Sequence, residues 1–312
     1  MALSTIGIDI SKDHLDAYRL SDGARRRFPN DRTGLRALRK WLEEQPPERI
    51  VYEPTGPYHR LLEHTLLRAG LPLIKVNPRQ ARRFAEATGK LAKTDRADAA
   101  LLARMGAVLD LKERALPDES LAHLKELFLA RQALVRDRSA AKNRQKVLTV
   151  PLLKRQNRSR LRHIEAQLAA VDQAIEAAIV EQAELAQRMQ ILLTIPGISK
   201  LTAFALLIEM PELGTLNEKQ AASLAGLAPI TRQSGSWTGR AFIRGGRASL
   251  RQALYMPALV AARFYPDLKA KYLQLRTTGK PAKVAITAIM RKLLIVANAL
   301  LRDGRKWTPK TA

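Results

Sequence analysis

Four acidic residues in the first third of the chain have the side-chain type and the sequence context of ligands for divalent metal ions. Asp9 alternates with isoleucines in the segment 6–10, and Glu53 ends a short apolar segment immediately before Pro-Thr-Gly. A carboxylate among β-branched residues is costly to bury unless a partner or a metal neutralises it. Asp95 and Asp98 are three residues apart, so a helix presents both on one face. Such oxygen ligands suit one or two Mg²⁺ ions that hold a phosphodiester.

Each of these acids also has a simpler explanation when it is taken alone. Asp95 could cap a helix N-terminus with Asp98 three residues later, and Glu53 could be a surface residue at a strand end. The basic residues Lys93 and Arg96 lie beside the helical pair and would bring a phosphate backbone to it. The four acids together therefore favour the metal-site interpretation.

A second candidate site lies in segment 232–247, which is rich in serine, glycine and arginine. Because Gly235 has no side chain, a bulky phosphate can approach the hydroxyl of the neighbouring Ser234 closely. Arginines can hold the non-bridging oxygens and stabilise charge that develops on them, and this segment carries Arg232, Arg240, Arg244 and Arg247. Spacing alone still favours a simpler explanation, a flexible loop whose arginines only hold the backbone of a nucleic acid.

The charge of the whole chain indicates a polyanionic partner. Its 312 residues include 54 Lys+Arg and 29 Asp+Glu, which gives a net charge of +25. Two blocks concentrate this charge: 17 Lys/Arg follow residue 227 with only two acids, and 11 Lys/Arg lie in 131–162 with one acid. Solvated surface is the alternative explanation, but blocks this long favour nucleic-acid contact, with Arg138, Lys142 and Arg144 as candidate contacts. Cysteine is absent, which excludes disulfides and thiolate metal sites.

Hydrophobic periodicity predicts the elements that must position these residues. Alternating or short apolar segments predict strands at 6–10, 16–20, 49–53 and 71–76, and amphipathic segments predict helices at 34–44, at 58–68 and from about 94. Strands followed by an alternation of strands and helices indicate an α/β sheet domain.

The middle of the chain is predicted to be helical. Residues 119–188 contain no glycine, and Pro151 is their only proline. Apolar positions spaced alternately by four and three residues run from Ile164 to Met189, which predicts a helical hairpin or coiled coil bent near Pro151. A single amphipathic helix packed on its own domain is the alternative, although the strict heptad favours pairing, including pairing with a second subunit.

The segment LLTIPGISKLTA at 192–203 resembles a helix–hairpin–helix, whose turn amides bind a phosphate backbone without reading bases. A plain turn between two helices is the alternative. The start of the chain has no basic segment before an apolar one, so we expect no secretory signal. Arg291 and Lys292 interrupt the apolar segment 285–301, so we expect no membrane span and a cytoplasmic, nucleoid-associated protein.

Seven motifs occur in a fixed order along nearly the whole chain: GIDISKDHLD, YEPTGPYH, VNPRQARRFAEATGKLAKTDRADAALLA, LLTIPGIS, LAGLAPI, QSGSWTGR and LRQALYMPALVA. The chain thereby resembles the DEDD transposases of a large insertion-sequence family, described as bridge-RNA-guided recombinases. The resemblance implies an α/β plus all-α fold. Its parts are a RuvC-like (RNase H-like) domain at 1–116, a coiled-coil helical hairpin at 117–190 and a mainly helical transposase domain at 191–312.

The same resemblance implies a site and its partners. The family's four metal-binding acids match Asp9, Glu53, Asp95 and Asp98, and its nucleophilic serine matches Ser234. It implies Mg²⁺ as cofactor, donor and target DNA, a structured guide RNA, and a homo-oligomer, a dimer or a tetramer, in which subunits share a composite centre. Many relatives carry a Ser-Lys pair after the nucleophile loop where this chain has Arg-Gly-Gly-Arg, which leaves the individual roles of those two arginines open.

Three functions are therefore compared. The first is a transposase–recombinase that uses a phosphoserine intermediate and Mg²⁺ under the guidance of an RNA. The second is a metal-only, junction-resolving nuclease in which Ser234 takes no part, and the third is a non-catalytic nucleic-acid packaging protein. Packaging requires the positive charge but not the acids, and hydrolysis requires the acids but not the serine. Since the sequence contains all three ingredients, the recombinase is the leading hypothesis.

Overall fold

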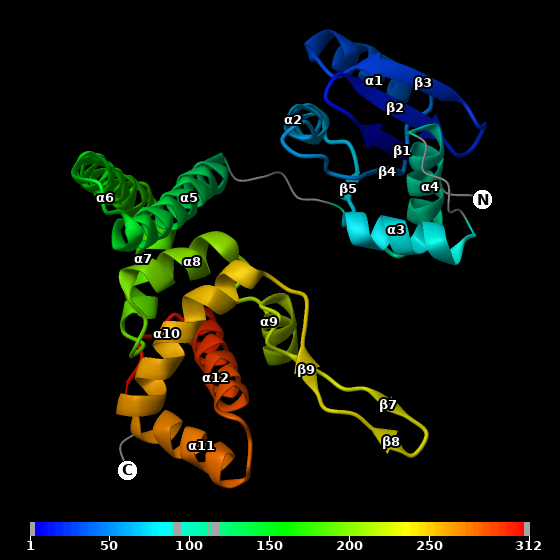
Figure 1. Ribbon diagram of the computed structural model, residues 1–312. Helices are drawn as coiled ribbons and strands as arrows, with labels where there is room; N and C mark the ends of the chain where they lie inside the picture. Colours follow the sequence, from blue (N-terminus) through cyan, green and yellow to red (C-terminus); the bar gives the residue numbers. More distant parts are fainter. Residues whose placement is uncertain (1–3, 90–94, 112, 114–118, 309–312) are drawn as a thin grey trace. The chain divides into compact units, whose positions relative to one another are not determined.

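The computed structural model describes residues 4–89, 95–111, 113 and 119–308, and Figure 1 shows the course of the chain. Contacts between residues divide the chain into two compact units, Met1–Asp118 and Glu119–Ala312. The second unit contains both the helical hairpin and the C-terminal helices.

The first unit is built on a mixed five-stranded sheet. Its order is β3-β2-β1-β4-β5, in which β1, β2 and β3 form an antiparallel meander and β4 and β5 run parallel to β1. The strands are β1 (Thr5–Ile10), β2 (His14–Arg19), β3 (Arg25–Pro29), β4 (Arg49–Tyr52) and β5 (Leu73–Lys75). The helices are α1 (Arg32–Glu44), α2 (Arg60–Arg68), α3 (Pro78–Ala87) and α4 (Asp95–Val108).

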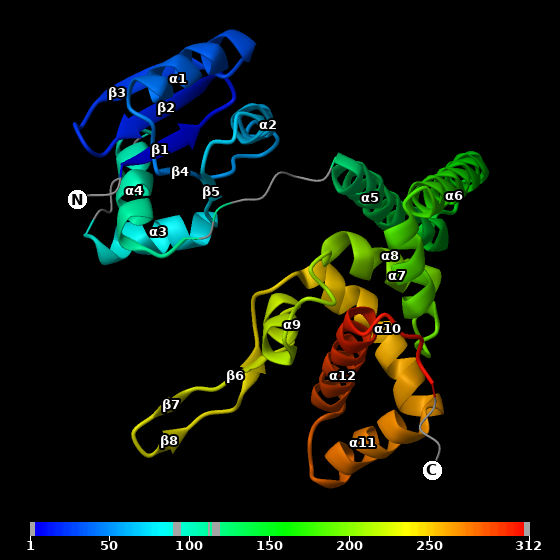
Figure 2. The same ribbon diagram turned by 180° about the vertical axis from the view of Figure 1, so that it is seen from behind.

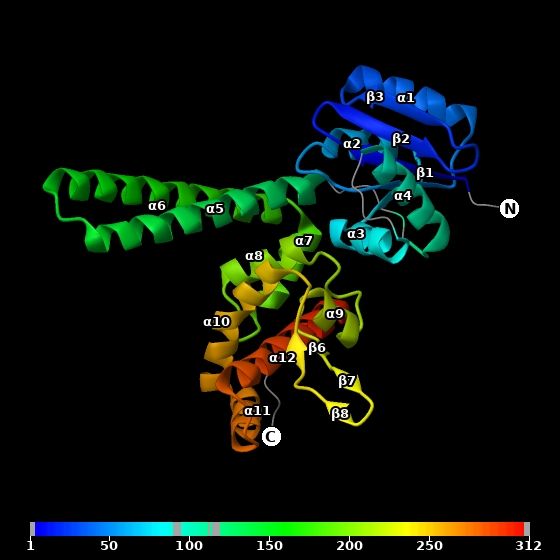
Figure 3. The same ribbon diagram turned by 45° about the vertical axis from the view of Figure 1, so that its right-hand side comes forward.

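Helices cover both faces of this sheet, as Figure 3 shows with α1 above it and α3 and α4 below it. Alternate residues of β1 serve the two faces. Ile6, Ile8 and Ile10 pack with Trp41 of α1 and with residues of α2. On the other face, a core that includes Val51 packs against α3 and α4. β1, β2 and β4 therefore each have one row of side chains turned toward α4.

Two elements of this unit have no counterpart among the elements expected from the sequence. β3 begins with three consecutive arginines, which give no apolar alternation, and it forms the edge of the sheet. α3 has only one buried residue, Ala81, and begins after an Asn77 cap with proline as its first residue. The other predicted strands and helices of the unit are confirmed, with ends that differ by a few residues.

The second unit begins with a long helical hairpin, which Figure 3 shows in side view. α5 (Glu119–Val147) and α6 (Pro151–Val180) pack along each other. The buried amide of Asn157 on α6 donates hydrogen bonds to the Ala141 carbonyl and to Gln145 Oε1, at 2.9 and 2.7 Å. A salt bridge between Arg131 of α5 and Asp172 of α6 joins the two helices at the end of the hairpin that is nearer to the rest of the unit.

The heptad seam that the sequence predicts does not run through one helix. Ile164 and Leu168 pack in the hairpin with Ala141 of α5, whereas Ile175 packs into the core of the C-terminal helices. α6 ends at Val180, and α7 begins three residues later. The regular spacing therefore continues across a helix break, because both helices turn an apolar face to neighbouring parts of the same core.

Six further helices make the core of the second unit. They are α7 (Ala183–Leu193), α8 (Lys200–Glu209), α9 (Glu218–Leu224), α10 (Ala248–Phe264), α11 (Pro266–Thr277) and α12 (Ala282–Arg302). α12 is long and apolar enough to cross a membrane by length and composition, and half of its apolar window is buried. It contributes Ile289, Leu293 and Leu294 to the core, which is typical of a central helix in a bundle.

The turn between α7 and α8 packs closely against α10. Gly197 has a φ of 85°, and a Cβ atom at this position would lie 2.9 Å from the carbonyl oxygen of Pro257. Ser199 caps α8 by accepting a hydrogen bond from the Thr202 amide. The segment is thus two helices joined by a glycine turn, and its binding of a phosphate backbone stays a prediction.

Candidate catalytic centres

Asp9 and Glu53 each follow one residue of the same register pair, at the same edge of the sheet. Ile8 of β1 and Tyr52 of β4 are partners in the parallel ladder, and each acid is the next residue along its strand. Parallel strands that are in register end side by side. Both acids are half-buried. The two strands therefore present two carboxylates from neighbouring positions.

α4 crosses the same face of the sheet with its N-terminal end toward these acids. Gly106 near the end of α4 lies against Thr5 and Val51, where an added Cβ would be 2.9 and 2.4 Å from their side chains. A Cβ on Gly7 would lie 1.9 Å from the carbonyl oxygen of Ala99, nearer the start of α4. The C-terminal end of β1 therefore lies nearer to the first turn of α4 than its N-terminal end does.

Strand alternation then places the acids on the α4 side. Asp9 is two residues after Gly7, and Glu53 is two residues after Val51, so both share the face that α4 covers. Asp98 is half-buried and precedes Ala99. The backbone therefore directs three of the four predicted acids toward one edge of the unit.

The fourth acid, Asp95, is the first residue of α4, but its side chain lies outside the described part of the structure. The same holds for the side chain of Arg96 and for Lys93 as a whole. Among the residues described, no group of three or more histidine or acidic side chains is placed to hold a metal ion. Two observations support a metal site at these acids: the backbone brings them to one edge, and their side chains offer oxygen ligands.

A buried polar network supports the strand that precedes Glu53. Tyr52 and His59, the two ends of the motif YEPTGPYH, belong to it, although the sequence alone assigns neither a role. Tyr52 donates a hydrogen bond to Glu63, whose side chain is 8% exposed. Lys75 at the end of β5 donates to Glu63 Oε1 at 2.9 Å and lies 2.8 Å from His59 Nε2. The network ties the ends of β4 and β5 to α2. The signals in the sequence that could have found it are the polar residue that ends each apolar strand and the motif at 52–59.

Ser234 lies near the tip of a two-stranded arm, which Figure 2 shows extending from the α9 side of the second unit. The base of the arm pairs β6 (Pro229–Ile230) with β9 (Phe242–Ile243), and the tip pairs β7 (Gln233–Ser234) with β8 (Trp237–Thr238). The open loop that the spacing alone favoured is therefore a hairpin with fixed register.

The turn of this arm fixes the position of Ser234. Ser234 and Trp237 are register partners, and the two residues between them make the turn. Gly235 has a φ of 55°, and no residue other than glycine has a positive φ in the described chain, so the turn has the glycine-first pattern typical of tight hairpins. Both Ser234 and the Trp237 ring are exposed. Ser234 is thus exposed beside a two-residue turn.

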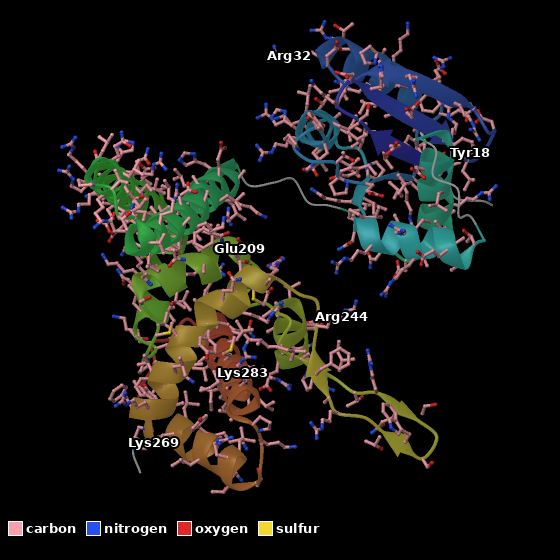
Figure 4. All side chains as sticks on the ribbon, in the orientation of Figure 1. Tyr18, Arg32, Glu209, Arg244, Lys269 and Lys283 are labelled. Atoms are coloured by element: carbon pink, nitrogen blue, oxygen red, sulfur yellow. The ribbon has the colours of Figure 1, made fainter. Side chains whose placement is uncertain are left out.

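The arginines of the arm fall into two groups. Arg232, Arg240 and Arg244 are exposed, and the Arg232 guanidinium lies 4.7 Å from the centre of the Phe242 ring. Figure 4 labels Arg244 at the base of the arm. Three accessible cations therefore belong to the same arm as the serine hydroxyl.

Arg247 differs because its guanidinium is engaged within the protein. It donates two hydrogen bonds to Glu212, at 2.8 and 2.7 Å, and a third to the Glu209 carbonyl. These bonds hold the pKa of Glu212 below its ordinary value and raise the pKa of Arg247. The pair anchors the chain where the arm joins α10, which makes Arg247 a support of the arm more than a phosphate contact.

The basic block of the hairpin lies toward its distal end. Lys142 and Arg144 are exposed and Arg138 is half-buried, all on α5. On α6, Arg155, Arg158, Leu161 and Arg162 line a cavity of about 500 Å³. Both helices therefore carry exposed cations from this block.

Comparison with known proteins gives consistent matches. A family model for DEDD transposases of the IS110 type matches residues 6–150, and one for transposases of the IS116/IS110/IS902 family matches residues 189–273. Pilin gene-inverting proteins of Moraxella bovis and Moraxella lacunata are each 31% identical to this chain, over 98% of both lengths. An uncharacterized 43.6 kDa protein of insertion element IS110 from Streptomyces coelicolor is 34% identical over 42% of this chain and 33% of its own. The first matched range contains the four acids, and the second contains Ser234.

Proposed function

Since this chain belongs to the IS110/IS116/IS902 family of DEDD insertion-sequence transposases and is a DNA transposase or recombinase, we propose that it exchanges strands through a phosphoserine formed on Ser234. The observation that carries this proposal is the exposed Ser234 at the turn of an arginine-bearing hairpin. The family's DEDD domain implies an RNase H-like fold, with which the mixed sheet of the first unit is compatible.

The proposed reaction is a pair of transesterifications. In the first, a bond forms between Ser234 Oγ and a DNA phosphorus, the bond from that phosphorus to one DNA oxygen breaks, and the serine proton passes to the departing oxygen. In the second, the hydroxyl of another DNA end attacks the phosphoserine, and a proton returns to serine. No water is consumed and the number of phosphodiesters is conserved, so joining is as accessible as cutting.

The main task of the protein in this reaction is to stabilise the negative charge on the transferred phosphate. A serine hydroxyl is a weak nucleophile at neutral pH and must be helped by groups that stabilise the developing negative charge. Arg232, Arg240 and Arg244 are proposed to hold the non-bridging oxygens, because they are exposed on the same arm. Arg247 is proposed to support the arm through Glu212.

DEDD transposases typically use divalent metal ions, and we propose Asp9, Glu53, Asp95 and Asp98 as the residues that would hold Mg²⁺ here. Hard carboxylate oxygens are the ligands that this ion prefers, and the backbone placement of three of the acids at one edge supports the assignment. When bound, the ion would supply Lewis-acid stabilisation of phosphate oxygens. By holding the positively charged ion, the acids would orient the DNA phosphate that is to be cut.

The guide RNA is proposed to bind the basic hairpin. Arg138, Lys142 and Arg144, with the arginines that line the α6 cavity, offer an extended basic surface suited to RNA backbone and shape. Exchange between two DNA partners requires more than one nucleophile, so the active species is proposed to be a homo-oligomer, a dimer or a tetramer, acting at the nucleoid in the cytoplasm.

The test compares two serines of the same turn. Protein, RNA, labelled donor or target DNA and Mg²⁺ are incubated and then separated by denaturing electrophoresis. The wild type should give a slow, protease-sensitive band, and Ser234→Ala should lose both this band and the cut product. Ser236→Ala, two residues away in the turn, is the matched control and should retain at least part of each.

The junction-resolving nuclease is the competing function, and the same gel distinguishes it. A nuclease that uses only the acidic edge would cut DNA in the Ser234→Ala variant and never form an adduct, because water would be the nucleophile. That result would replace the recombinase chemistry by hydrolysis. The packaging function is set aside because the family comparison identifies a DNA transposase or recombinase.

A further inference from the structure

The face of the sheet that carries Asp9 continues outward over β2 and β3. Asp9 is the register partner of Asp16, and Asp16 is the partner of Arg27. One step back along the ladders, Tyr18 is the partner of Arg25. Because side chains alternate along a strand and register partners share a face, all of these side chains lie on the α4 side. A basic surface therefore adjoins the acidic edge.

This surface is hollowed. A cavity of about 330 Å³ is lined by Ala99 of α4 and by six residues of β2 and β3, namely Asp16, Ala17, Tyr18, Arg25, Arg26 and Arg27. Ala99 follows Asp98, one of the predicted acids. The cavity thus lies between the two outer strands and the helix that carries part of the acidic edge.

Both arginines are held in defined orientations while they remain accessible. Arg27 donates through Nε and Nη2 to the two carboxylate oxygens of Asp16, each at 2.9 Å, and its side chain is 51% exposed. The Arg25 guanidinium lies 5.1 Å from the centre of the Tyr18 ring, and Arg25 is exposed. A guanidinium that is already oriented loses less freedom when it binds a phosphate.

We propose that this surface, formed by Tyr18, Arg25 and Arg27, binds the sugar–phosphate backbone of the DNA strand that reaches the acidic edge. Arg25 and Arg27 contact two adjacent phosphates on one side of the reacting one, and the cavity accepts the sugar between these two phosphates. The assignment rests on the proposed function, in which the acids of this edge act on DNA. It adds a binding site for a substrate strand that the four acids and the arm do not supply.

A purely protective role for these arginines is the main alternative. β3 is an edge strand, and charged residues on an edge hinder pairing with another sheet. Arg26 separates the two explanations. It also borders the cavity, but strand alternation turns its side chain to the opposite face, where its guanidinium approaches Glu44 of α1 at 3.9 Å. Protection of the edge would involve Arg26 as much as its neighbours, whereas the proposed DNA site would not.

The experiment uses the full chain and short single-stranded DNA that carries a photoreactive thymine analogue. After irradiation, cross-linked peptides are identified by mass spectrometry. The wild type and Arg26→Gln should give cross-links within residues 14–29, and Arg25→Gln/Arg27→Gln should lose them. The double variant should also lower the slope of log affinity against log salt by roughly 1.4, about 0.7 for each lost phosphate contact on a single strand.

Two controls keep the result interpretable. Glutamine retains hydrogen bonding to Asp16, and circular dichroism with thermal unfolding checks that the double variant is folded. If the folded double variant cross-links as the wild type does, or if Arg26→Gln has an equal effect, the proposal is overturned. Stronger labelling of residues 14–29 by an RNA oligonucleotide of the same sequence would also overturn it and assign the surface to the guide.

The outcome is independent of the serine chemistry. Cross-linking to residues 14–29 requires no covalent step, so the Ser234→Ala variant should give the same peptides as the wild type. If adducts form on Ser234 but these cross-links are absent, only the DNA site on β2 and β3 is wrong. If the cross-links form while Ser234→Ala still cuts DNA, the phosphoserine proposal fails and the binding site stands.

Discussion

At the scale of single residues, the four acids of the first unit are proposed to act through the negative charge that binds the metal ion. Asp9→Asn, Glu53→Gln, Asp95→Asn and Asp98→Asn each remove one carboxylate with little change of size. We expect each variant to lose strand exchange and retain most nucleic-acid binding, since one ligand of a divalent site is lost but the net charge of +25 changes by only one. Recombination assays in Mg²⁺ and filter binding measure the two effects. A variant that recombines fully would show that its acid is not an essential ligand.

Gly7 makes a second prediction at this scale, for stability. A Cβ at Gly7 would lie 1.9 Å from the Ala99 carbonyl oxygen and 2.5 Å from the Ala103 nitrogen, so α4 would have to move. Gly7→Ala should therefore destabilise the protein by about 3 kcal/mol, the upper range for overpacking. Gly106→Ala is the matched comparison. Its new Cβ would lie 2.4 Å from Val51 Cγ2 and 2.9 Å from Thr5 Cγ2, which are side-chain and not backbone atoms, and alanine would add helix propensity. Urea unfolding measures the free energy of unfolding of both variants. A larger loss for Gly106→Ala than for Gly7→Ala would contradict the close packing of β1 against α4.

At the scale of elements, the arm depends on how it is fixed to the helices. A Cβ on Gly246 would lie 2.1 Å from the backbone nitrogen of Gly226, so the two ends of the arm touch backbone to backbone. Arg251 closes the same junction with hydrogen bonds to the carbonyls of Ala225 and Gly245, at 3.2 and 2.6 Å. Together with the pairing of Arg247 and Glu212, these contacts hold a long hairpin that has little core of its own.

The pairing of Arg247 and Glu212 predicts a pH dependence. The folded-state pKa of Glu212 is lowered, so its stabilising contribution is present above the unfolded-state value of about 4.5 and is lost as the pH falls through the folded-state value. We expect Glu212→Gln to cost about 1 kcal/mol at pH 7, a modest amount because the pair is partly exposed, and less at pH 3.

Urea unfolding at the two pH values measures this difference. The single variant Arg247→Gln and the double variant Glu212→Gln/Arg247→Gln complete the thermodynamic cycle, which isolates the interaction between the two side chains. A cost of Glu212→Gln that is the same at pH 3 and pH 7 would show that its charge does not support the arm.

At the scale of the whole molecule, the excess of positive charge predicts strong salt dependence. We expect Arg138→Gln/Lys142→Gln/Arg144→Gln to reduce both RNA affinity and its dependence on salt, because fewer counterions are released when fewer phosphates are neutralised. A change of equal charge on the C-terminal helices of the same unit, Lys269→Gln/Lys271→Gln/Lys283→Gln, is the control for the general positive field. Figure 4 labels Lys269 of α11 and Lys283 of α12. A salt titration of labelled RNA measures both. RNA affinity that does not change with salt, or an equal effect of the control, would contradict a guide site on the hairpin.

Local periodicity by itself determined most elements of this protein. The alternation at 6–10 made β1 a strand with Asp9 on one face, and the helical spacing after Pro151 made α6 a long helix. Such patterns are readable because each depends on neighbouring residues that repeat with the period of the element. The ordered motifs likewise suffice to identify the family, since each motif is a run of adjacent residues.

Tertiary structure decided the features that depend on partners distant in the sequence. β3 forms because β2 supplies its hydrogen bonds, although three arginines give it no apolar pattern. Arg247 faces Glu212, 35 residues earlier, and no local pattern distinguishes it from the exposed arginines of the arm. The alignment of Asp9 with Glu53, and of Arg27 with Asp16, comes from ladder register, which is set by the whole sheet. A one-residue shift of register would turn these side chains to the opposite face, so residue types alone could name the candidates but not bring them together.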